Sequence, residues 1–153
     1  MIDEIDARIL EMLQENARTA NAEIARRVGM TASAVFERIK KLEKSGVLKG
    51  YAAVVDAAAV GLPVLAYVFV RLSPHRLART VGGQLCEIRG VQEVIHLTGE
   101  ECFMVKTRCR DTAELERIVL SINDIETVSG TRTVIAFRSM REGLTVPVQA
   151  GQG

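Results

Sequence analysis

Hydrogen-bonding and basic side chains gather on one side of a segment that begins at Thr31 and ends at Gly46. Between Thr31 and Gly50 five bases stand against two acids, so the local charge is +3, whereas the whole chain carries only +1. Cations concentrated in this way suit the phosphates of a nucleic acid. The residues we assign to this chemistry are Thr31, Ser33, Ala34, Glu37, Arg38, Lys41 and Lys44.

The other side of the same segment is apolar. Val35, Ile39 and Leu42 recur at i, i+4 and i+7, which predicts a helix with one buried stripe. A shorter apolar helix precedes it and ends at Gly29, where a glycine can adopt a positive φ. Two short helices joined by a tight turn predict a helix-turn-helix, whose second helix enters the major groove of DNA.

Each candidate residue has an expected role on the duplex. Arg38 can form a forked pair with a guanine edge, and such a pair discriminates by ~1–3 kcal/mol. Ser33 and Lys41 are better placed for phosphate or mixed contacts, which fix register without specifying sequence. Arg26 and Arg27 on the preceding helix suit phosphates or plain solvation equally well. The alternative for the whole set is a solvated charged face.

A second polar segment lies at residues 98–102, with the sequence TGEEC, between two predicted strands. Gly99 exposes backbone amides at a bend, and such amides hold a carboxylate. A nearby glutamate can hold an ammonium group, so the segment suits a free α-amino acid. The alternative is an ordinary hairpin with Glu100 and Glu101 in water. Cys102 beside it is a filler thiol or, less simply, a redox sensor.

The remaining patterns predict an α+β chain. An amphipathic helix spans 3–15 and completes a three-helix core, because two helices alone bury too little surface. Residues 50–55 alternate like a short strand, and 56–63 form a short helix and a turn. Four strands are predicted, at 64–72, 91–97, 102–109 and 127–137. One helix, starting at Ser73-Pro74, follows the first strand. A second helix follows the third strand; Asp111 caps it and Glu114 stands three residues later, as in a capping box.

This order is βαββαβ, a ferredoxin-like antiparallel sheet with both helices on one face. Its uncovered face keeps apolar residues that a monomer would leave in water, so self-association is expected. The predicted domains are a helix-turn-helix domain at 1–50, a hinge with a strand at 51–63, a βαββαβ domain at 64–140 and a flexible tail at 141–153.

Composition narrows the classes of protein to which this chain can belong. The chain has 153 residues, of which 48% are hydrophobic and 25% charged, as in folded proteins. Three cysteines without CxxC spacing predict no metal site and no disulfide framework. There is no signal-like start and no apolar run of ~20 residues, so we expect a cytoplasmic protein without a membrane span. No catalytic constellation and no cofactor motif is present, and an enzyme is not expected.

Three stretches together resemble one family. They are Asp3-x-x-Asp6-x-x-Ile9-Leu10, then Ile24-Ala25-Arg26-Arg27-Val28-Gly29, then Arg38-Ile39-x-x-Leu42-Glu43 continuing to Gly46-Val47-Leu48-Lys49-Gly50-Tyr51. With the later Thr98-Gly99-Glu100 turn, they resemble the leucine-responsive regulator and AsnC family, the feast/famine transcription factors. The match spans residues 2–140.

The resemblance implies a sequence-specific regulator that binds double-stranded DNA. It also implies homodimers formed through the βαββαβ domains, assembled further into tetramers or octamers, with an amino-acid effector bound between dimers. It places the effector at Leu97, Thr98, Gly99, Glu100, Glu101 and Cys102, with Thr131 and Thr133 contributed by a neighbouring subunit. Family members commonly show Gly-Asp-Tyr-Asp where this chain has Gly-Glu-Glu-Cys, which predicts an unusual effector or none.

Two other functions fit the same layout. One is an architectural protein that wraps DNA without an effector. The other is a metabolite-binding module or enzyme on a ferredoxin-like fold, since that fold hosts many activities. Symmetric assembly predicts a pseudo-palindromic DNA site with half-sites about one helical turn, or a multiple of it, apart.

Overall fold

The structure is a computed structural model that describes residues 2–73, 78–143 and 145–151. The chain divides into two compact units. The helical unit contains residues 1–54 and 141–153, and the sheet unit contains residues 55–140. The last segment therefore groups with the helices at the start of the chain, which differs from the separate flexible tail expected from the sequence.

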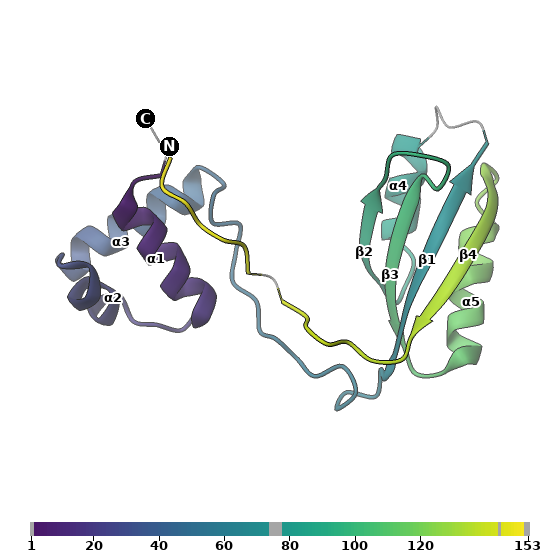
Figure 1. Ribbon diagram of the computed structural model, residues 1–153, viewed down its shortest axis with the longest axis horizontal. Helices are drawn as coiled ribbons and strands as arrows, with labels where there is room; N and C mark the ends of the chain where they lie inside the picture. The colour runs from purple at the N-terminus through teal and green to yellow at the C-terminus, as the bar shows by residue number, and fades with distance from the viewer. Residues whose placement is uncertain (1, 74–77, 144, 152–153) are drawn as a thin grey trace. The chain divides into compact units, whose positions relative to one another are not determined.

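Three helices build the helical unit: α1 (Glu4–Glu15), α2 (Asn21–Val28) and α3 (Ala32–Lys44) (Figure 1). Residues next to the helix ends fix where these helices start and stop. Asp3 and Asp6 form a reciprocal capping box at α1, and Thr31 accepts the N–H of Ala34 at α3. Gly29 ends α2 at φ 72°, a left-handed conformation that a Cβ would strain.

The core of the helical unit is one apolar cluster from all three helices. Leu48, beyond α3, packs against it as a partly buried residue, whereas Val47 is 48% exposed. The buried members are Ile9, Leu13, Ile24, Ala25, Val28, Val35 and Ile39. Val35 and Ile39 belong to the stripe predicted from the helical spacing.

The hinge differs from its prediction. Residues 51–55 alternate in sequence, yet in the described chain they are exposed and pair with no strand. Alternation predicts a strand only where another edge supplies hydrogen bonds. The expected short helix at 56–63 is a single turn, in which the Asp56 carboxylate accepts the N–H of Ala58 and Gly61 closes the turn at φ 81°.

The sheet unit has the predicted βαββαβ order: β1 (Val64–Leu72), α4 (Ala78–Cys86), β2 (Val91–His96), β3 (Phe103–Cys109), α5 (Thr112–Asn123) and β4 (Val128–Ala136). The strands are antiparallel and ordered β2-β3-β1-β4. Element ends differ from the predictions by one or two residues. The expected helix start at Pro74 lies outside the described residues, and Asp111 caps α5 as predicted.

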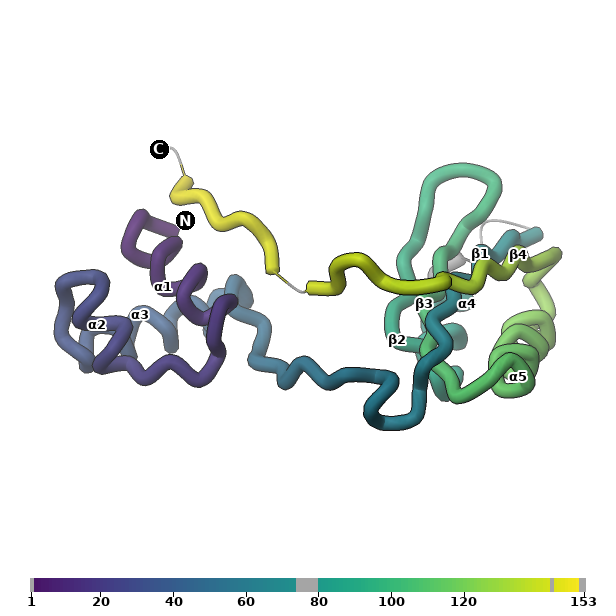
Figure 2. Tube along the Cα trace, turned by 60° about the horizontal axis from the view of Figure 1, so that its bottom comes forward, coloured from purple at the N-terminus to yellow at the C-terminus, as the bar shows by residue number. Residues whose placement is uncertain are grey.

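Both helices cover one face of this sheet (Figure 2). Val68, Val81 and Ile122 are among the fully buried side chains between the sheet and the helices. Gly82 lies where a Cβ would come within 3.3 Å of the Phe103 ring, so this glycine allows α4 to approach β3 closely, whereas a Cβ at Gly83 would meet nothing within 4 Å. The other face, called the open face below, includes Tyr67, Phe69, Ile95, Met104, Arg132 and Val134 by strand register.

Candidate nucleic-acid interface

One face of α3 is exposed along its whole length. Relative to the buried stripe of Val35, Ile39 and Leu42, this face lies on the opposite side of the helix and presents a hydroxyl, a carboxylate and three ammonium groups. We call it the outer face of α3, and its members are Ser33, Glu37, Lys40, Lys41 and Lys44. All five are exposed, and four of them were predicted site residues.

Lys40 was missed as a site residue, although its spacing of seven from Ser33 could have found it. Its ammonium lies 6.0 Å from the centroid of the Phe36 ring. Two other predicted residues support the helix start instead of the outer face. Thr31 is the N-cap, its hydroxyl also lies 3.1 Å from that of Ser33, and Ala34 is half-buried.

Arg38 does not lie on the freely exposed face where the sequence analysis placed it. Its Nη1 donates to Asp3 Oδ2 at 2.6 Å and to Asp6 Oδ1 at 2.8 Å. Only 28% of the Arg38 side chain and 11% of the Asp6 side chain are exposed. The backbone N–H of Asp6 and then the Arg38 guanidinium lower the pKa of the Asp3 carboxyl. We call this cluster the Arg38 triad; it joins α3 to the start of α1.

Arg26 and Arg27 share a carboxylate on their own helix. Glu23 accepts from Arg26 Nη2 at 2.8 Å and from Arg27 Nε at 2.7 Å, and these bonds lower the pKa of Glu23. Both arginine side chains remain more than half exposed, so either can still meet a phosphate. Arg8 of α1 donates to the carbonyl of Arg27, which supplies a partner for the end of α2.

Beside the outer face lies a groove of about 370 Å³. Phe36 and Tyr51, each 51% exposed, form part of its wall, together with Leu13 and Ala17. The Tyr51 hydroxyl donates to Glu43 at 2.9 Å, and burial and then this carboxylate raise the pKa of Tyr51. The groove extends the α3 surface with apolar side chains that can meet thymine methyl groups or sugars.

In the sheet unit, the predicted effector segment is a tight connection between β2 and β3. The N–H of Leu97 donates to the carbonyl of Cys102 at 2.8 Å, and the N–H of Cys102 donates to Val70 on β1 at 2.8 Å. Gly99 has φ 110°, and Thr98, Gly99 and Glu100 are exposed. The structure therefore presents an exposed glycine-containing bend, as predicted.

Glu101 has a partner that the sequence analysis missed. Arg132 on β4 donates from Nε and Nη2 to the two Glu101 oxygens at 2.8 and 2.9 Å, and these bonds lower the pKa of Glu101. The Arg132 guanidinium also lies 4.2 Å from the centroid of Phe69. Strand alternation around Arg132 could have placed it on the open face.

The predicted partners Thr131 and Thr133 lie on the helix-covered face instead, because neighbouring residues of a strand point to opposite faces. The Thr131 hydroxyl lies 3.2 Å from the Asn123 side chain at the end of α5. Cys102 is 3% exposed and belongs to the core cluster between sheet and helices. Its side chain is therefore turned into the core rather than toward the bend.

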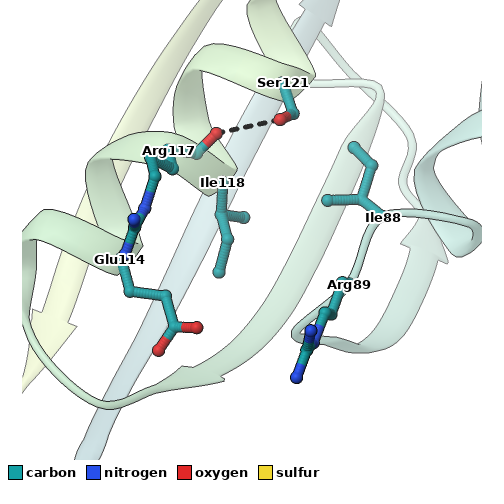
Figure 3. A pocket seen from close by; sticks show the side chains of 6 residues that line it. All are labelled: Ile88, Arg89, Glu114, Arg117, Ile118 and Ser121. Carbon is teal, nitrogen blue, oxygen red and sulfur yellow. Dashed lines mark hydrogen bonds between the residues drawn. The ribbon is translucent and has the colours of Figure 1, made fainter.

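A second groove, of about 200 Å³, lies in the sheet unit between α5 and the α4–β2 connection (Figure 3). Its lining residues are Ile88, Arg89, Glu114, Arg117, Ile118 and Ser121. The Ser121 hydroxyl donates within its own helix to the Arg117 carbonyl at 2.9 Å, and Glu114 accepts from Arg110. The Ser121 hydroxyl and the Glu114 carboxylate are thus occupied by partners close to them in the chain and do not converge on the groove. We therefore do not assign the effector to this groove.

Among the residues that the structure describes, no group of three or more His, Cys, Asp or Glu side chains could hold a metal ion. Likewise, no helix in the described ranges is long and apolar enough to cross a membrane. The fold and the outer face of α3 together define a helix-turn-helix DNA-binding protein with a separate ferredoxin-like domain.

Comparison with known proteins identifies the family. Residues 2–43 match the AsnC-type helix-turn-helix domain, and residues 65–146 match the Lrp/AsnC ligand binding domain. The chain belongs to the Lrp/AsnC family of transcriptional regulators, which confirms the resemblance and the fold class drawn from the sequence. The exposed α3 and the bend at residues 97–102 thus lie in the two domains that this family combines.

Similar proteins span nearly the whole chain. The HTH-type transcriptional regulator FL11 of Pyrococcus furiosus is 32% identical over 149 residues, covering 97% of this chain and 98% of that protein. The Leucine-responsive regulatory protein of Rhizobium meliloti is 30% identical, covering 96% of each. The structure of E. coli AsnC is 26% identical with a TM-score of 0.88, covering 97% of this chain and 99% of that one.

A regulator from Neisseria meningitidis, NMB0573, was solved as a complex with L-Met. It is 26% identical and has a TM-score of 0.88, over 96% of this chain and 97% of that one.

Proposed function

We propose that the outer face of α3 enters the major groove and that its lysines contact phosphates. The observation that supports this most is the division of α3 into two sides. The apolar side and Arg38 are used to pack the helical unit, whereas Lys40, Lys41 and Lys44 extend from the exposed side. Arg26 and Arg27 add phosphate contacts from α2, and Ser33 and Glu37 face base edges near the start of the helix.

In this proposal Arg38 positions the helix and does not contact bases. A fork onto guanine would first break bonds to two carboxylates, one of which is almost buried. The energy of such a bidentate base contact, ~1–3 kcal/mol, is no larger than that of the charge-assisted bonds it would replace. Sequence preference then depends on the outer face and on Phe36 beside it.

The effector we propose is an amino acid bound at residues 97–101 on the open face of the sheet. The exposed amides near Gly99 suit its carboxylate, and Glu101 with Arg132 offers a charge pair that an ammonium or a second carboxylate can enter. The relative solved with L-Met supports an amino acid as the class. Thr131 and Thr133 of a neighbouring subunit, which the resemblance suggests as hydroxyl partners, are left out of the proposed site because in each subunit they lie on the helix-covered face of the sheet.

A homodimer through the open face completes the proposal. Ile95 and Val134 remain 41% and 42% exposed there, beside the half-buried Tyr67, Phe69 and Met104. A second copy would cover these apolar groups, and further assembly to tetramers or octamers would place several α3 helices on one duplex. The DNA site is then pseudo-palindromic, and an effector changes DNA binding only if it binds one assembly more tightly than another.

We place this DNA-binding activity in the cytoplasm, and it requires no catalytic step.

The experiment is a mobility-shift titration at low salt with the region upstream of the gene for this chain. We expect retardation with a discrete stoichiometry, and its complete absence would contradict DNA binding by α3. Calorimetry with the twenty amino acids tests the effector separately. Heat of binding from one or a few of them supports the proposal, and none from any of them favours the architectural protein without an effector.

A further inference from the structure

The end of the chain forms specific contacts with α1 inside the helical unit. The side-chain amide of Gln14 donates from Nε2 to the Val146 carbonyl at 3.0 Å and accepts the Val146 N–H at 2.7 Å. One carboxamide thus satisfies both backbone groups of a residue, as a paired residue of a neighbouring strand does. Farther along, the Gly151 N–H donates to the Ile2 carbonyl at 3.2 Å.

The two anchor points fit a fully extended segment. Five residue steps from Val146 to Gly151 span about 17 Å in an extended chain. Ten helical steps from Glu4 to Gln14 span about 15 Å, and Ile2 and the extended N-cap Asp3 lie before them. The tail therefore runs the length of α1 in the opposite direction, and its yellow end lies beside the start of α1 in both views (Figures 1 and 2).

Sequence and burial of the tail agree with this path. Val146 precedes a proline, which favours an extended backbone at Val146. Val148 and Ala150 are half-buried, whereas Pro147 and Gln149 are exposed, so burial alternates with the period of a strand. Val146 itself is 65% exposed, so the covered side of the segment runs from Val148 to Ala150.

Helix α1 has a second covered stripe on the side of Gln14. Ala7, Leu10 and Gln14 follow each other at i, i+3 and i+7 and therefore share a side of the helix. Ala7 and Leu10 are only 7% and 6% exposed, yet they lie outside the main apolar cluster of the helical unit. Ala7 is two positions from Ile9 and therefore lies on nearly the opposite side of the helix.

We propose that residues 145–151 are a docking strand for α1 and that Gln14 is the residue that holds it. The chain then connects the helical unit to the sheet unit twice, once through residues 49–63 and once through the docked tail. None of the contacts named involves the outer face of α3. Docking therefore leaves that face open and restricts the motion of the helix-turn-helix, which favours simultaneous binding of two such domains to one duplex.

The docking is tested on the full chain by the ¹⁵N heteronuclear NOE of Val146, Val148 and Ala150. In the wild type we expect values close to those of α1. Gln14→Ala should lower all three values to those of a free chain end, and Val146→Pro should do the same for Val148 and Ala150, since a proline at 146 has no N–H to measure. Glu11→Ala on the same helix should leave all three unchanged. Values already low in the wild type, or unchanged in both variants, would overturn the docking.

The consequence for DNA rests on the proposed function and is measured by anisotropy with the upstream duplex. Gln14→Ala and Val146→Pro should weaken binding about three- to tenfold, with Glu11→Ala unchanged. Equal or tighter binding by both variants would overturn the positioning role. If even the wild type fails to bind this duplex, the proposed function fails, and the NOE result still decides whether the tail docks.

Discussion

The Arg38 triad gives the most direct test of how the helical unit is held together. Replacing Arg38 with methionine keeps the length and the apolar stem but removes the guanidinium. The Asp6 carboxylate, in a side chain that is 11% exposed, then loses its ion-pair partner. Asp3 loses the same partner but is 53% exposed and can be solvated. We expect the variant to fold and to be destabilised.

The magnitude follows from the two bonds. A hydrogen bond to a charged group is worth about 1.5–3 kcal/mol, and we apply this range to the Asp6 bond because it is shielded. The exposed Asp3 bond is discounted to the ~0.5 kcal/mol of a surface pair. The sum is about 2–3.5 kcal/mol, which at about 4–8 °C per kcal/mol corresponds to a fall of about 8–28 °C in Tm for a unit of this size.

The assay is thermal unfolding of the full chain, monitored by circular dichroism. Urea is added so that the unfolding transition of the helical unit and that of the sheet unit are separated. Lys44→Met on the outer face of α3 is the matched control and should change Tm by less than 2 °C or so, as surface substitutions do. Adding Asp6→Asn to Arg38→Met should recover part of the loss, because the two residues are coupled.

Two results would refute this reasoning. One is an Arg38→Met helical unit that unfolds like the wild type. The other is a stable Arg38→Met protein that has lost its preference among DNA sequences, because that outcome identifies Arg38 as the guanine reader that the sequence analysis expected.

Two further predictions concern the ends of the helices. Thr31→Ala should destabilise the helical unit by ~1 kcal/mol in urea unfolding, because it removes the N-cap of α3, whereas Ser33→Ala should stay within ~0.5 kcal/mol; equal losses would contradict the assignment. The lowered pKa of Asp3 predicts stability that is complete above the unfolded value of ~3.9 and is lost as the pH falls through the lower folded value. Asp3→Asn should flatten that acid dependence, and an unchanged acid profile would contradict it.

The sequence predicted those elements whose residues interact with close neighbours. The capping residue Asp111 acts within three residues of itself, and β1 is an apolar run interrupted only by Arg71, so both kinds of signal are complete in one stretch. The strand order also followed, because βαββαβ admits few topologies.

Features that depend on residues far away in the chain could not be predicted from the sequence. Arg38 looks like a solvent-facing base until Asp3 and Asp6, more than thirty residues away, are placed beside it. Residues 51–55 show the alternation of a strand, but in the described chain they pair with no other strand. The facing of Thr131 and Thr133 depends on the register of β4 against β1, which the pattern of β4 alone does not fix.

The central claim is that the outer face of α3 contacts DNA, and the salt dependence of binding measures it most directly. For the wild type, the double variant Lys41→Ala/Lys44→Ala and the control Arg89→Ala, the dissociation constant for the upstream duplex is followed against salt concentration. The double variant should bind more weakly and lose up to ~1 unit of slope per phosphate contact, about 2 in all, while Arg89→Ala keeps the wild-type slope. A double variant with wild-type affinity and slope would contradict the account.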